Sequence, residues 1–137
     1  MEPIVVDTNI LVASFIETDS LHQQSQPYIA GLENGDYIFH LPMLVVVEVF
    51  AAISRPPTAN RLALLVRADR SIRSWEHSGK ILLYPLDRAR LDHSVAIAKR
   101  DRLLGADSVV AALAEELAIP LKTFDVDILN RSSLAST

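Results

Sequence analysis

The chain has 137 residues, half of them hydrophobic, and a formal net charge of -4. This length suffices for one well-filled core and is too short to expect two domains. No apolar run approaches the roughly 20 residues that a membrane span needs, and the first residues show no basic region followed by a long apolar stretch. We therefore expect a soluble, cytoplasmic protein.

The sequence contains no cysteine, which restricts its chemistry. Disulfides, thiolate metal sites and cysteine nucleophiles are excluded, so any metal must be bound by oxygen or imidazole. The negative net charge argues against a general electrostatic attraction to nucleic acid, which normally requires clustered Lys and Arg. It does not exclude a nuclease, because acids gathered at one site lower the total charge and a bound divalent cation reverses the local sign.

The first half of the chain alternates between strand and helix patterns. Asn34-Gly35 favours the end of a helix, since glycine readily adopts the left-handed conformation. Pro56-Pro57 forbids continuation of the helix before it, although the valines at 45–47 in that segment also permit a strand. The expected elements are a strand at 4–6, a helix over 10–15, a helix at 21–32, a strand at 36–40, and a helix from Pro42 to about Ser54.

The second half continues the alternation. The expected elements are a helix from Thr58 or Asn60 to near Gly79, a strand at 81–84, a helix capped by Asp87, a helix from about 106 to 118, and a strand at 120–124. The apolar side of the first helix is expected at Leu62, Leu65, Val66 and Ile72, and that of the second at Leu91, Val95 and Ala98.

Strands separated by helices of this size imply a three-layer α/β/α fold with a mostly parallel central sheet of about four to five strands. We expect residues 1–131 to form this single domain. Residues 132–137 are expected to be a frayed tail or a weak edge strand.

Four carboxylates lie among apolar neighbours, where an ionised acid is costly unless it is paired, protonated or bound to a metal. Asp7 and Asp125 follow apolar strand patterns, and the carboxyl ends of parallel strands meet at one edge of a sheet. Asp107 shares the inward face of its helix, and Glu48 lies within the apolar run 44–50. One shared cation site explains all four acids, and hard oxygen ligands favour Mg²⁺ or Mn²⁺ over Zn²⁺.

Each acid also has a purely structural explanation. Asp7 and Asp125 are suited to cap the helices that follow them, and Asp107 is suited to the first turn of a helix because of the helix dipole. Glu48 has Arg55 two turns later on roughly the same side, which permits a buried ion pair. The sequence leaves these explanations open.

The order of these motifs resembles that of PIN domains, and most closely the VapC ribonuclease toxins of bacterial toxin-antitoxin pairs. Four blocks carry the resemblance: Val5-Val6-Asp7-Thr8-Asn9, Glu48 in the third helix, Gly105-Ala106-Asp107-Ser108, and Leu121-Lys122-Thr123-Phe124-Asp125-Val126-Asp127. The resemblance extends over residues 1–131. Asp-Thr-Asn alone is a weak signal, whereas all four blocks in this order are a strong one.

The resemblance implies a PIN-like fold and an acidic quartet that binds Mg²⁺ or Mn²⁺ and carries catalysis, namely Asp7, Glu48, Asp107 and Asp125. Asp127 assists or replaces Asp125 as the last ligand in this interpretation. The positions of Thr8, Asn9 and Thr123 often provide polar support in the family. The chain departs from the family at Ile128, where an aromatic residue is common.

The resemblance also implies a reaction and partners. It implies metal-dependent hydrolysis of RNA phosphodiester bonds, a homodimer, and a cognate VapB-like antitoxin that covers the active groove. We expect an apolar surface of the third helix to supply part of an interface, at Val46, Val49, Phe50 and Ile53. Arg67, Arg70 and Arg73 on the long helix are interpreted as a solvated face rather than as contacts to RNA or to an acidic partner.

Three other functions stay open. A phosphatase of the haloacid dehalogenase class also places Asp after its first strand, but it needs a second acid two positions later, where this chain has Asn9. A PIN nuclease of RNA maturation would act without an antitoxin. A catalytically silent PIN scaffold would bind RNA or protein, and the presence of all four acids argues against it.

Overall fold

A central sheet of five parallel strands, in the order β3-β2-β1-β4-β5, organises the fold in the computed structural model, which describes residues 1–137. The strands are β1 (Glu2–Val6), β2 (Tyr37–Pro42), β3 (Ile81–Tyr84), β4 (Leu121–Lys122) and β5 (Ala135–Ser136). The helices are α1 (Thr8–Phe15), α2 (His22–Asn34), α3 (Met43–Ser54), α4 (Arg61–His77), α5 (Arg88–Asp101), α6 (Gly105–Leu117) and α7 (Val126–Arg131).

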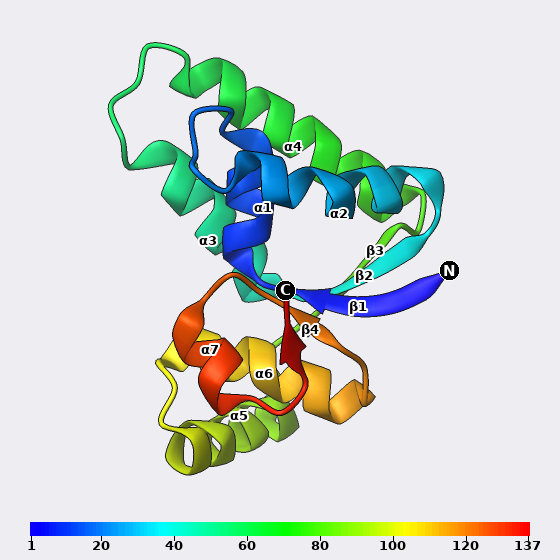
Figure 1. The fold of residues 1–137 in the computed structure, drawn as a ribbon, viewed down its shortest axis with the longest axis vertical. Coiled ribbons are helices and arrows are strands. Elements are labelled where there is room, and N and C mark those ends of the chain that lie inside the picture. The colour runs from blue at the N-terminus through cyan, green and yellow to red at the C-terminus, as the bar shows by residue number, and fades with distance from the viewer.

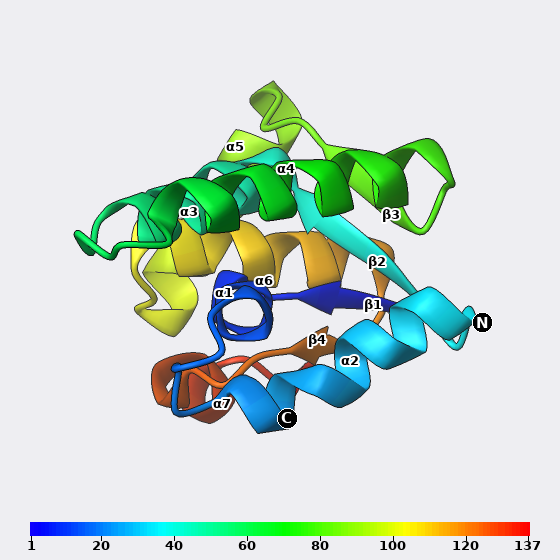
Figure 2. The ribbon, with the colours of Figure 1, turned by 90° about the horizontal axis from the view of Figure 1, so that it is seen from above.

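Helices cover both faces of this sheet. Helices α1 to α4 lie on one side and α5 to α7 on the other (Figure 1), and β2, β1 and β4 run side by side between them (Figure 2). Parallel neighbours require such crossover helices, so the three-layer α/β/α prediction is confirmed. None of the helices combines the length and the apolar character that crossing a bilayer requires.

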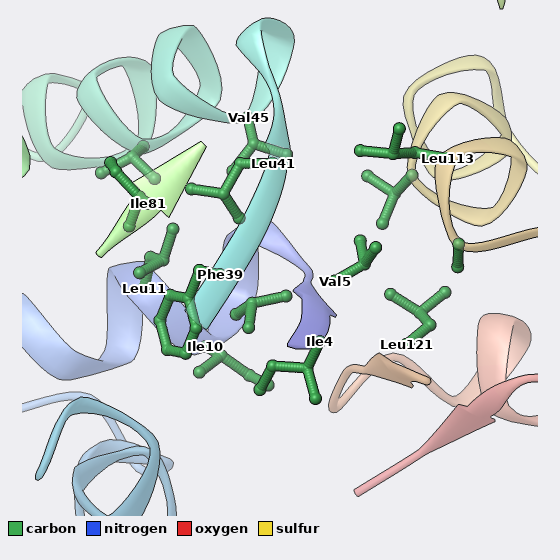
Figure 3. Close-up of a cluster of buried hydrophobic side chains, with 14 of the residues drawn as sticks. Ile4, Val5, Ile10, Leu11, Phe39, Leu41, Val45, Ile81, Leu113 and Leu121 are labelled. Atoms are coloured by element: carbon green, nitrogen blue, oxygen red, sulfur yellow. The ribbon is translucent and has the colours of Figure 1, made fainter. Parts of the chain in front are cut away.

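Strand β1 lies at the centre of the core. Ile4 pairs in register with Phe39 of β2, which pairs with Ile81 of β3, so these three side chains form one row on one face of the sheet. Val5 pairs with Leu121 of β4 on the opposite face, and Figure 3 shows the two groups pointing apart. Burial of each such side chain stabilises the fold by roughly 1.5–3 kcal/mol. The packing therefore fixes the end of β1, where the first acid lies.

Helices begin and end largely at the residues that the sequence predicts. Gly35 caps α2 with φ 84° in the left-handed region, and the Asp87 side chain accepts a hydrogen bond from the Arg90 backbone N–H at 2.9 Å at the start of α5. The segment with the valine triplet is helical, so its alternative reading as a strand is wrong. Residues 135 and 136 form the weak edge strand that the sequence allowed.

The predicted strand at 120–124 is wrong in its length, since β4 contains only Leu121 and Lys122. The Thr123 hydroxyl and the Phe124 backbone N–H turn instead to side chains of the β1–α1 segment, which ends the regular pairing. The chain then enters the short helix α7, with Ile128 fully buried where the family often has an aromatic residue.

The predicted apolar side of α4 is wrong in part. Leu62 and Val66 are 72% and 52% exposed, whereas Ala68, Ile72 and Trp75 form the buried side. The core is reached by the second half of this long helix, where the small Ala68 permits close approach, while the first half extends beside the loop that follows α3 (Figure 1).

The predicted inner stripe of α5 is also wrong in part, since only Ala98 of its three residues is half-buried. Leu91 and Val95 are exposed, and Ser94 and Ile97 are the buried residues. The Ser94 hydroxyl donates to the Arg90 carbonyl oxygen at 2.7 Å, which satisfies this polar group inside the interface between α5 and α6. A hydrophobicity pattern does not reveal this local bond.

The apolar surface expected on α3 is wrong at two of its four residues. Val49 and Ile53 are core residues, and Val46 and Phe50 are half-buried against that core. The exposed apolar side chains of α3 are Met43 and Val47, because the helix turns its other side toward β2, α1 and α4.

Candidate active site

Asp7 is the most buried of the predicted acids. It follows β1 directly, caps α1, and is only 5% exposed. Its Oδ1 accepts a hydrogen bond from the Thr8 backbone N–H at 2.8 Å, and its Oδ2 accepts from the Thr123 hydroxyl at 2.8 Å. Burial raises the pKa of Asp7, the two hydrogen bonds oppose this effect, and the charges of Asp125 and Glu48 add to it. Both carboxylate oxygens are thus held in place from two strand ends.

Glu48 is oriented by a residue far away in the sequence. Its Oε1 accepts a hydrogen bond from the Thr8 hydroxyl at 3.0 Å, which links α3 to the first turn of α1. The buried ion pair with Arg55 that the sequence permitted is wrong, because Arg55 is exposed and forms no salt bridge. The partner of Glu48 is a hydroxyl, and its charge is not neutralised.

Asp107 lies in the first turn of α6 and is half-buried. Its pKa is raised to about 6, with burial as the largest cause, followed by the charges of Asp7, Asp125, Glu48 and Asp127. The carboxylates from four separate segments therefore act on one another electrostatically. The first-turn position predicted from the helix dipole is confirmed, but burial and then the surrounding negative charge outweigh that stabilisation of the ionised form.

Asp125 begins α7 as its cap. Its Oδ1 accepts hydrogen bonds from the backbone N–H groups of Asp127 at 2.8 Å and Ile128 at 3.2 Å. The Asp125 backbone N–H donates to the Thr123 hydroxyl at 3.0 Å, so Thr123 joins Asp125 to Asp7. The capping roles of both Asp residues are confirmed, and the same two carboxylates also contribute to the raised pKa of Asp107. Asp127, two residues later, is exposed.

Asn9 completes the polar support. Its side-chain oxygen accepts a hydrogen bond from the Phe124 backbone N–H at 3.3 Å, which ties α1 to the segment after β4. The sequence predicts polar roles for Thr8, Asn9 and Thr123 only through the family resemblance, because each hydrogen bond joins residues at least 40 positions apart. In Figure 2 the starts of α1, α6 and α7 gather at one end of the sheet, where β1 and β4 end.

No cation of the protein neutralises this cluster. The salt bridges of the structure involve other acids, and none includes a member of the acidic cluster, which we define as Asp7, Glu48, Asp107, Asp125 and Asp127. No three side chains of His, Asp or Glu are close enough to hold a metal ion directly. An open hollow lies beside Glu48 and Thr8, and it is also lined by Arg55 and Pro56.

The fold and the acidic cluster together define the class of protein. It is a three-layer α/β domain with a parallel sheet, and carboxylates without a cationic partner lie near the carboxyl ends of its strands. The model of the PIN domain family matches residues 4–133. The chain therefore belongs to the PIN domain family. No curated protein matches it significantly.

Solved structures share this fold at low sequence identity. FitAB bound to an IR36 DNA fragment is 20% identical with a TM-score of 0.72, and the match covers 96% of this chain and 92% of that one. The sarcin-ricin loop cleaving toxin VapC20 of Mycobacterium tuberculosis is 17% identical with a TM-score of 0.72, covering 93% of both chains. PAE2754 of Pyrobaculum aerophilum is 18% identical with a TM-score of 0.71, covering 98% and 88% respectively. These similarities show the fold.

Proposed function

We propose that the chain is a Mg²⁺- or Mn²⁺-dependent endoribonuclease that hydrolyses RNA phosphodiester bonds. The observation that carries the proposal is the arrangement of Asp7 and Glu48, whose carboxylates accept hydrogen bonds from the Thr123 and Thr8 hydroxyls while no cation of the protein pairs with either. Clustered charge of this kind is typical of functional sites. PIN family membership supports the same conclusion.

The donors of the acidic cluster fit a hard divalent cation. They are oxygen atoms only, and Mg²⁺ commonly keeps several waters and contacts only one or two carboxylates directly, so a loose cluster meets its requirements. We assign the binding role to Asp7, Glu48, Asp107 and Asp125, with Asp127 as the alternative to Asp125. When bound, such a cation supplies an activated water nucleophile and neutralises charge on the phosphate.

The residues of the chain prepare the site for this chemistry. Thr8 and Thr123 hold Glu48 and Asp7 in single orientations through their hydroxyls. Asp107 and the other acids attract a cation, and they repel the phosphate in its absence, so a bound cation strengthens substrate binding at the cluster. No side chain is required to form a covalent intermediate.

We further propose that the protein is the toxin of a VapBC-type pair, with a VapB-like antitoxin and a homodimeric assembly. The similar fold of the VapC20 toxin supports the first part. The exposed apolar side chains Met43 and Val47 on α3 offer surface for a second copy. A maturation nuclease without an antitoxin is distinguished by whether native expression without a co-expressed partner arrests growth.

A cleavage assay tests the activity. Native protein with Mg²⁺ or Mn²⁺ is expected to cut single-stranded or looped RNA, and Asp7→Asn and Glu48→Gln are expected to lose cleavage while they keep the native circular dichroism spectrum. Glu76→Gln, an exposed acid of α4 outside the cluster, serves as the matched control. Equal cutting by the native and cluster variants would assign the activity to contamination or to another site.

A further inference from the structure

A series of adjoining hollows leads away from the acidic cluster. The hollow beside Glu48 and Thr8 shares Pro56 with a second hollow between the ends of α1 and α3 and the start of α4. The second hollow shares Arg67 with a third along the exposed side of α4, which Arg70 also lines. The loop after α3 and the start of α4, which border these hollows, are at the upper left of Figure 1.

Each hollow is lined by an arginine without a partner. Arg55, Arg67 and Arg70, which we call the basic track, are exposed, and their guanidinium groups form no salt bridge and no hydrogen bond within the chain. Other exposed arginines are paired: Arg73 of α4 with Asp69 at 3.0 Å, and Arg88 of α5 with Asp92 at 3.3 Å. The basic track therefore keeps its full capacity to bind an external anion.

The geometry of Arg55 favours a role next to the acidic cluster. It follows α3 directly and lies seven residues after Glu48, about 10 Å along a helix axis. Pro56 and Pro57 come next and stiffen the backbone that carries it. A phosphate at the acidic cluster is repelled by the carboxylates, so a strand is held there more firmly if its neighbouring phosphates meet cations.

We propose that Arg55 and Arg67, continued by Arg70, bind backbone phosphates of a single-stranded RNA whose reacting bond lies at the acidic cluster. One guanidinium group can donate two parallel hydrogen bonds to the oxygens of one phosphate. Because the three arginines follow one another along adjoining hollows, they suit a polyanion better than one small ligand. The exposed Glu17 also lines the middle hollow and weakens this attraction. The assignment rests on the proposed nuclease function, but RNA binding is measurable without cleavage.

The test uses fluorescence anisotropy of a labelled single-stranded RNA of about 12 nucleotides in buffer with EDTA, where cleavage is suppressed. Arg55→Ala and Arg67→Ala are each expected to weaken binding about fivefold and to reduce the slope of log affinity against log salt by about 0.7. Arg55→Lys should retain the slope, and Glu17→Gln should tighten binding. Arg73→Ala and Arg88→Ala are the controls, because these paired arginines lie outside the three hollows.

Several results would overturn the basic track. These are native protein that binds no RNA, equal losses in the control and track variants, and track variants that lose affinity only for a labelled poly-glutamate peptide, which would assign the surface to an acidic protein partner. Divalent-dependent cleavage with normal RNA binding by the Arg55 and Arg67 variants would refute the track alone. Reduced RNA binding by these variants, with no cleavage by native protein, would support the track and refute the nuclease proposal.

Discussion

Replacement of Asp107 by Asn is expected to stabilise the protein at neutral pH in the absence of divalent cations. The pKa of Asp107 is raised from an ordinary 3.8 to about 6. Because one pKa unit corresponds to about 1.4 kcal/mol, a rise of about two units sets an upper limit of about 3 kcal/mol. The side chain is only half-buried and its charge is screened by solvent, so we expect a gain of about 1 kcal/mol.

The direction of the pH dependence follows from the raised pKa of Asp107. Below about pH 4 the carboxyl is protonated in the folded and unfolded states, so its charge contributes nothing. Between about pH 4 and 6 the unfolded chain releases the proton more readily than the folded one, and the native protein loses stability relative to Asp107→Asn. Above about pH 6 the full difference is present. A dominant helix-dipole contribution would give the opposite dependence, because it favours the ionised form.

Urea unfolding followed by circular dichroism measures this effect between pH 4.5 and 8 in buffer with EDTA. With an m-value of about 2 kcal/mol/M, the Asn variant should unfold at a midpoint about 0.5 M higher at pH 7.5, and the difference should shrink toward pH 4.5. Glu76→Gln, far from the acidic cluster in the sequence and exposed, should show neither change. A less stable Asn variant at pH 7.5, or a gain independent of pH, would refute this electrostatic account of the cluster.

Three further substitutions test the supporting contacts. Thr123→Val removes a donor from the buried Asp7 carboxylate and should lower the free energy of unfolding by about 1–3 kcal/mol in urea titrations, whereas Thr123→Ser should retain most of it. Thr8→Val frees Glu48 and should reduce RNA cleavage about tenfold with little change in melting temperature; unchanged cleavage would refute the orienting role. Phe39→Ala in the fully buried row of the sheet should lower the free energy of unfolding by about 3–5 kcal/mol, and a loss below 1 kcal/mol would contradict the packing described for β2.

The sequence predicts the positions of the acids well, because the spacing of apolar residues around each acid indicates which side of its strand or helix is buried. A buried apolar strand that is followed by Asp7 must place that acid at the carboxyl end of the strand. Parallel pairing of β1 with β4 brings the segment of Asp125 to the same end of the sheet. Glu48 and Asp107 are predicted to belong to the same site because an acid within an apolar helical pattern has few structural explanations. The bond between Thr123 and Asp7 was beyond local reasoning, since it joins residues 116 positions apart.

The sequence prediction differs from the structure where tertiary contacts decide which of two similar helix faces is buried. Hydrophobicity favoured Leu62 and Val66 for the core, but the sheet is contacted by the half of α4 that carries Ala68 and Ile72. Ser94 is buried because its hydroxyl bonds to the backbone of its own helix, which a polarity scale counts against burial. Such choices depend on where neighbouring helices lie, and only the folded structure supplies that information.

Binding of a divalent cation by the acidic cluster is tested most directly by titration with Mn²⁺, followed by electron paramagnetic resonance of the free ion. Native protein is expected to bind Mn²⁺, and Asp7→Asn and Glu48→Gln are each expected to weaken binding about tenfold or more, a loss of about 1.4 kcal/mol. Glu76→Gln should bind like the native protein. Equal affinity in all four proteins, or no binding by the native protein, would contradict the assignment of these carboxylates to a cation site.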